Sequence, residues 1–106
     1  MTLREVLDSA ADAAAEDASV PIDARIDPDG AVVWAVGSTV FATLDPSGTT
    51  ASFRLDPLVA GAAARTPDVG SSFLGPEWVE FRPATLDGHA ADRAAAWFAA
   101  AARRAG

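Results

Sequence analysis

The sequence predicts an α+β fold with three helices and an antiparallel sheet, on three observations. Apolar residues recur at helical spacing at both ends of the chain, over residues 2–18 and 87–104. Between these segments, short apolar or alternating runs are separated by the turn-forming residues Gly, Pro, Asp and Ser. Asp56 followed by Pro57 interrupts this pattern and is typical of a helix start. The predicted order is helix, three strands, helix, two strands, helix, in one domain spanning residues 1–106.

The first helix is expected over residues 2–18. Its apolar stripe recurs every three or four residues: Leu3, Val6, Leu7, Ala10 and Ala14. Thr2 and Glu5 have the spacing of a capping box, which satisfies the free N–H groups of a first turn. Val20 and Pro21 are expected to end this helix.

Three strands are expected to follow as an antiparallel meander: residues 31–36, 39–44 and 49–55. A turn at residues 27–30 precedes the first strand, because it holds Asp, Pro, Asp and Gly in succession. Gly37 and Ser38 predict a tight hairpin between the first two strands, and residues 45–48 predict the next turn.

The second half of the chain is expected to add a short helix over residues 57–65, closed by residues 66–70. Two brief strands follow, at residues 71–74 and 77–82, with a turn at Gly75 and Pro76 between them. The last helix, over residues 87–104, carries a stripe of small and aromatic residues: Ala91, Ala94, Ala95, Phe98, Ala101 and Ala102.

Alanine dominates the hydrophobic half of the composition, so large side chains available for the core are few. They are expected to be Trp34, Phe41, Phe53, Phe73, Trp78, Phe81, Trp97 and Phe98.

The chain carries a formal net charge of −7 at pH 7, with 15 acidic residues against 8 basic residues, all of them arginine. This excess argues against tight non-specific binding to nucleic acid or anionic membranes. A local basic patch remains compatible with it.

The absence of cysteine excludes disulfides, thiol catalysis and zinc sites built from thiolates. The N-terminus is acidic and amphipathic, unlike a secretory signal. No run approaches the roughly 20 apolar residues of a membrane span. We therefore expect a soluble, cytoplasmic protein with no membrane partner.

Three short motifs occur in order along the chain: GSTVFATL at residues 37–44, FRLDP at 53–57 and GPEWV at 75–79. Together they resemble the MmcQ/YjbR family, and the resemblance covers nearly the whole chain. Its matching positions are Gly37, Phe41 and Ala42 in a hairpin, Arg54 at a strand end, and Trp78 with Val79 before the last helix. The chain departs from the family pattern by one extra residue between the hairpin glycine and phenylalanine. It also has Ser38 or Thr39 where the family has a hairpin lysine.

The resemblance implies a two-layer α/β sandwich, related in shape to secretion-chaperone-like domains, and DNA binding. Strand alternation supplies candidate contacts: if Val79 and Phe81 face the core, Trp78 and Arg82 lie on the opposite face. The tentative nucleic-acid-binding residues are therefore Arg54, Trp78 and Arg82. An exposed tryptophan beside arginine can stack on a base or anchor a peptide. The alternatives are a covered tryptophan and ordinary solvated arginines.

A second candidate surface lies on the first helix, where Glu5, Asp8, Asp12 and Glu16 share a narrow stripe opposite the apolar one. It is either a solvated helix face or a docking surface for a basic partner.

No catalytic or cofactor signature is present. His89 is the single histidine and has no second ligand or nucleophile motif near it in sequence. Asp23, Asp27 and Asp29 lack the length and distal glutamate of a calcium loop, and turn formation explains them better. The glycine- and serine-rich residues 70–75 lack the lysine of a phosphate loop. The chain is therefore expected not to be an enzyme and to need no cofactor or metal.

Two functional hypotheses follow. The first is a non-catalytic binding module of the MmcQ/YjbR type, with weak DNA binding through a strand face. The alternative is a protein-interaction or chaperone-like module that binds no DNA, with a second copy or a basic polypeptide as its partner.

Overall fold

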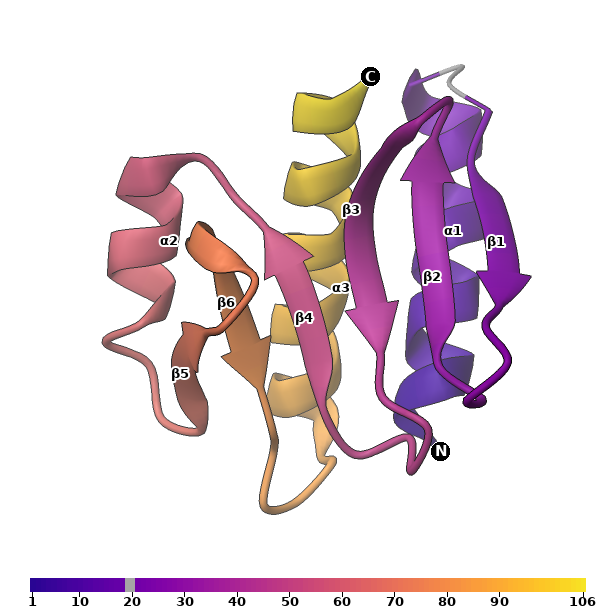
Figure 1. Ribbon diagram of the computed structural model, residues 1–106. Helices are drawn as coiled ribbons and strands as arrows, with labels where there is room; N and C mark the ends of the chain where they lie inside the picture. Colours follow the sequence, from indigo (N-terminus) through magenta and orange to yellow (C-terminus); the bar gives the residue numbers. More distant parts are fainter. Residues whose placement is uncertain (19–20) are drawn as a thin grey trace.

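The computed structural model describes residues 1–18 and 21–106. Its elements, in chain order, are α1 (Leu3–Ala18), β1 (Asp23–Ile26), β2 (Val32–Val36), β3 (Thr39–Leu44), β4 (Ala51–Arg54), α2 (Pro57–Ala63), β5 (Val69–Ser72), β6 (Gly75–Phe81) and α3 (Gly88–Ala105). The six strands form one antiparallel sheet in the order β1-β2-β3-β4-β6-β5 (Figure 1). Val20, predicted to end the first helix, lies outside the described residues.

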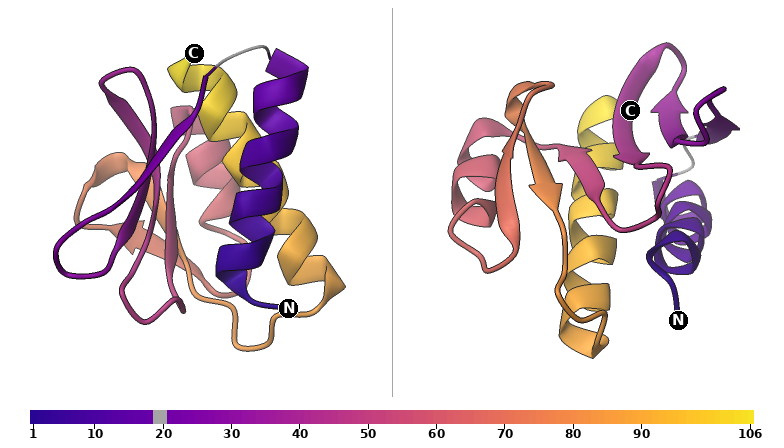
Figure 2. Two further views of the ribbon diagram at one scale, coloured as in Figure 1. Left: turned by 90° about the vertical axis from the view of Figure 1, so that its right-hand side faces the viewer. Right: turned by 60° about the horizontal axis from the view of Figure 1, so that its bottom comes forward.

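The helices and the sheet form two layers. The helices α1 and α3 lie side by side against one face of the sheet, and α2 packs against β6 (Figure 2). Within the described residues, the opposite face of the sheet carries no helix, and we call it the outer face. The predicted α+β class and its two-layer sandwich are confirmed.

The sheet has one strand more than predicted, because β1 precedes the meander. It pairs only with β2, so it is an edge strand, and all four of its residues are exposed. Asp23 and Arg25 alternate with Ala24 and Ile26 along it. Charged side chains are typical of edge strands, where they discourage pairing with another chain, and they also remove the hydrophobic signal that predicts a strand.

The turn between the last two strands lies at Phe73 and Leu74, and the predicted turn at Gly75 and Pro76 is wrong. The Leu74 N–H donates to the Ser72 hydroxyl at 3.1 Å within this turn, which lies two residues earlier than the predicted one. Gly75 starts β6 with a backbone φ of 138°, a conformation that residues other than glycine rarely adopt. Pro76 is tolerated because it lies at the start of the strand, before β6 pairs with β4.

The first two helices start with the predicted capping chemistry, and the third is capped in a similar way. The Thr2 N–H donates to Glu5 Oε1 at 2.8 Å, and the Glu5 N–H donates to Thr2 Oγ1 at 3.1 Å, so the capping box is formed. The Asp56 carboxylate accepts from the Leu58 N–H at 3.0 Å at the start of α2. The Asp87 carboxylate accepts from the N–H of Ala90 at 2.9 Å at the start of α3.

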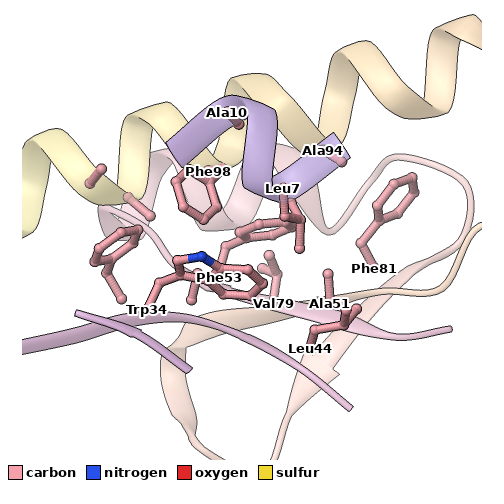
Figure 3. Packing of buried hydrophobic residues seen from close by; sticks show 14 of the residues in the cluster. Leu7, Ala10, Trp34, Leu44, Ala51, Phe53, Val79, Phe81, Ala94 and Phe98 are labelled. Atoms are coloured by element: carbon pink, nitrogen blue, oxygen red, sulfur yellow. The ribbon is translucent and has the colours of Figure 1, made fainter. Parts of the chain in front are cut away.

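The core lies between the sheet and the α1–α3 layer (Figure 3). Phe98 of α3 stands edge-on to two aromatic rings of the sheet, with centroid distances of 5.6 Å to Trp34 and 5.1 Å to Phe41. The neighbouring Trp97 makes a second edge-on contact with Phe81, at 5.2 Å. Such pairs add about 0.5–1.5 kcal/mol beyond the burial of their area. Most of the predicted large core residues are therefore in the core.

Phe73 is the clear exception among the predicted core residues. It is 91% exposed at the tip of the β5–β6 hairpin, next to Leu74, which is 44% exposed. Composition cannot separate a core phenylalanine from one on a turn, because both are equally hydrophobic in sequence. Two apolar side chains are thus displayed together at a hairpin tip.

Candidate outer-face binding site

The outer face brings together two of the three predicted nucleic-acid-binding residues. Arg54 and Trp78 are direct cross-strand partners in β4 and β6, so their side chains leave the sheet on the same face. Both are partly buried. Arg82 is exposed and lies four residues beyond Trp78, about 13 Å along an extended chain. Its guanidinium donates from Nε to the Thr50 hydroxyl at 2.8 Å.

Arg54 belongs to an ion-pair cluster with Glu77 and Arg104, at the end of the sheet where β4 ends and β6 begins. Arg54 Nε donates to Glu77 Oε2 at 3.0 Å. Arg104, in the last turn of α3, donates from Nη2 to Glu77 Oε1 at 2.8 Å and from Nη1 to Oε2 at 3.4 Å. Figure 1 shows that the end of α3 reaches this end of the sheet. The cluster therefore ties the outer face to the helix layer.

The Glu77 carboxylate stays ionised at neutral pH. Hydrogen bonds from Arg104, and then from Arg54, hold the pKa of Glu77 below its ordinary value. Glu77 and Arg104 were not among the predicted site residues. No short-range pattern connects them, because 27 residues separate them in the sequence.

Arg54 opens onto a hollow beside Trp78. We call it the Arg54 hollow; its lining includes Val40, Arg54, Leu74, Pro76, Glu77 and Trp78. Apolar and aromatic surface thus surrounds one arginine, which is 39% exposed at its side chain, and one carboxylate. Neither terminal nitrogen of Arg54 has a hydrogen-bond partner within residues 1–18 and 21–106.

A second hollow continues along the outer face. We call it the hydroxyl hollow; its lining includes Thr43, Thr50, Ser52, Phe73, Leu74, Glu80 and Arg82. Leu74 lines both hollows, so the two adjoin at the turn between β5 and β6. The hydroxyl groups of Thr50 and Ser52 belong to buried residues. The lining therefore combines small polar and charged groups with the exposed apolar side chains of Phe73 and Leu74.

Asp45, in the turn before β4, also lines the hydroxyl hollow and holds that turn together. Its Oδ1 accepts from the N–H groups of Thr49 at 2.9 Å and Thr50 at 3.0 Å, and its Oδ2 accepts from the Ser47 hydroxyl at 2.7 Å. Burial acts to raise the pKa of Asp45, but the hydrogen bonds from Ser47, Thr50 and Thr49 outweigh it and hold the pKa below its ordinary value. Asp45 is therefore a negative charge at neutral pH.

Charges of both signs line the two hollows and the ion-pair cluster beside them. The hollows are lined by Arg54, Arg82, Asp45, Glu77 and Glu80, and Arg104 adjoins them through its bonds to Glu77. Glu80 occupies the position between Trp78 and Arg82 on the same strand face. The surface is thus charge-balanced, without the continuous positive field that attracts a phosphate backbone.

Two of the four acidic residues predicted as a docking surface on α1 make local contacts at the start of that helix. Glu5 belongs to the capping box, and Asp8 accepts from Arg4 Nε at 3.0 Å. Asp12 and Glu16 are exposed and make no ion pair with any described residue. Of the four residues on this helix, only Asp8 is therefore in an ion pair with a described residue, and Asp12 and Glu16 also make no side-chain hydrogen bond to one.

Other candidate sites take no part in a cluster. His89 is exposed near the start of α3. Asp29 accepts from the N–H of Ala31 at 3.0 Å, as expected for a turn residue. In the part of the chain that the structure describes, no three metal-ligating side chains gather at one place. No described helix is both long and apolar enough to span a bilayer.

The chain was compared with protein-family models, with curated proteins and with solved structures, and none of these comparisons gave a significant match. The resemblance to the MmcQ/YjbR family therefore stays a prediction from the motifs, and the outer face must be interpreted from its own chemistry.

Proposed function

We propose that this domain is a non-catalytic module that binds a polypeptide on its outer face. The observation that supports this most is the composition of the two adjoining hollows. They offer exposed apolar side chains at Phe73 and Leu74, a partly exposed Trp78, and charges of both signs. Aromatic anchors within a mixed polar surface are typical of protein-binding sites. The proposal places the module in the cytoplasm, as the absence of cysteine allows.

DNA binding is the second candidate, and it is supported by the MmcQ/YjbR-like motifs and by the adjacency of Arg54 and Trp78. Against it, Glu77 is paired with Arg54 and Glu80 lies between Trp78 and Arg82, so the arginines do not form the continuous positive surface that a phosphate backbone needs. The net charge of −7 adds a repulsive field at longer range. Self-association through the hairpin tip, or a basic partner on Asp12 and Glu16, are further forms of the protein-interaction hypothesis.

The polypeptide proposal is tested with a library of random peptides displayed with free C-termini, selected in parallel on the wild-type protein and on Trp78→Ala. We expect sequences enriched on the wild type only, and the corresponding synthetic peptides to bind at least tenfold more weakly to Trp78→Ala. Trp78 is partly exposed, so this variant should fold, and circular dichroism checks that it does.

A labelled mixed-sequence DNA duplex is titrated alongside, with fluorescence anisotropy as the readout. We expect no binding at physiological salt. Absence of enrichment on the wild type would overturn the polypeptide proposal. Micromolar DNA binding that falls steeply with salt would overturn it in favour of the second candidate.

A further inference from the structure

The guanidinium of Arg54 is held in place but is only partly used. Its Nε is bound to Glu77 Oε2 at 3.0 Å, which fixes the plane of the group, while both terminal nitrogens lack a described partner. Arginine binds carboxylates through two parallel N–H bonds, and a pre-oriented fork loses less freedom on binding. The free edge of Arg54 is thus suited to a planar oxyanion.

The hydrogen bonds of the cluster leave Arg54 as the arginine that can bind a further anion. Arg104 uses both terminal nitrogens on Glu77, and it also interacts electrostatically with Asp56. Arg54 contacts Glu77 through Nε alone. The two terminal nitrogens of Arg54 therefore remain to bind one carboxylate.

The walls of the Arg54 hollow add an apolar requirement. Val40, Leu74, Pro76 and Trp78 line it beside the guanidinium. A ligand whose charged group meets Arg54 would therefore bury an apolar group next to that charge.

The adjoining hydroxyl hollow extends the site beyond one residue. The two hollows meet at Leu74, and the strand from Trp78 to Arg82 runs about 13 Å, the length of about four extended residues. This length argues for a chain segment rather than a small acid.

We propose that the Arg54 hollow binds the C-terminal residue of a polypeptide, with the terminal carboxylate on the Arg54 guanidinium and an apolar side chain against Trp78 and Leu74. This inference rests on the proposed function and assigns the end of the polypeptide that the outer face receives. The preceding residues then lie along β6 toward Arg82.

The experiment uses two pools of fluorescent hexapeptides that end in leucine or phenylalanine, one with free C-termini and one with C-terminal amides. Amidation removes the terminal charge and leaves side-chain carboxylates unchanged. We expect the free acids to bind the wild type at least tenfold more tightly than the amides. We expect Arg54→Gln to abolish this preference and Arg54→Lys to reduce it, because lysine keeps the charge but not the two parallel bonds.

Arg103→Gln is the matched control. Arg103 is an exposed arginine adjacent to Arg104 in the sequence, and it makes no ion pair with Glu77. It should keep the preference for the free acid. A preference that survives in Arg54→Gln would overturn the assignment of Arg54.

The remaining outcomes separate this inference from the proposed function. Acids and amides that bind equally well, but more weakly to Trp78→Ala, would overturn terminus recognition and leave polypeptide binding intact. Failure of both pools to bind would overturn terminus recognition, while the displayed random library remains the test of polypeptide binding. Binding of 3-phenylpropanoate as tightly as the hexapeptides would overturn the assignment of a polypeptide ligand.

Discussion

Replacing Phe98 with alanine is expected to lower the free energy of unfolding by about 3–5 kcal/mol. Phe98 has no exposed surface and contacts the rings of both Trp34 and Phe41, so its removal leaves a cavity between α3 and the sheet. A loss of this size is a large share of the roughly 5–15 kcal/mol that stabilises a typical domain. Urea denaturation followed by circular dichroism measures it as a lower midpoint.

Phe73→Ala is the matched control, because it removes the same side chain from a site that is 91% exposed. It should change the free energy of unfolding by no more than about 0.5 kcal/mol. If Phe98→Ala cost less than about 1 kcal/mol, or if Phe73→Ala cost as much as Phe98→Ala, the packing of the core described above would be wrong.

Enlarging Ala94 to leucine is expected to destabilise the domain by about 1–3 kcal/mol. Ala94 is completely buried on α3, among the small residues that let this helix lie close to α1 and the sheet. Three additional carbon atoms can enter only if the helix moves or neighbouring side chains leave their preferred rotamers. Thermal unfolding measures the effect as a lower midpoint.

Ala96→Leu makes the same change two residues further along α3, at an exposed position. Alanine and leucine are both good helix formers, so the control should shift stability by no more than about 0.5 kcal/mol. Equal effects at both positions would mean that Ala94 does not lie at a close-packed contact.

Elements with a local signal could be predicted from the sequence. The Thr2 and Glu5 capping box involves residues three apart, and Asp56 caps a helix that begins at the next residue. Strand β3 has the predicted bounds because strong turn chemistry flanks it on both sides. In contrast, β1 depends on pairing with β2, and its own sequence carries charge at alternate positions.

In the candidate site, too, the local features could be predicted from the sequence and the long-range contacts could not. Alternation along β6 predicts that Trp78 and Arg82 share a face, because side-chain direction in a strand is a local property. The partner of Arg54 could not be predicted in this way, since 23 residues separate Arg54 from Glu77, and Arg104 comes from another layer. The exposure of Phe73 depends on where the hairpin turns, and that turn contains a hydrogen bond from the Leu74 N–H to the Ser72 hydroxyl.

The measurement that tests polypeptide binding on the outer face most directly is an NMR titration of the three tryptophan indole N–H signals. Trp34 lies in the core, Trp97 packs against Phe81, and only Trp78 borders the Arg54 hollow. Peptides selected from the displayed library should shift the Trp78 signal, assigned with Trp78→Phe, and leave Trp34 unchanged. The mixed-sequence DNA duplex should shift none of the three. A Trp78 signal that responds to the duplex and not to the peptides would contradict the account.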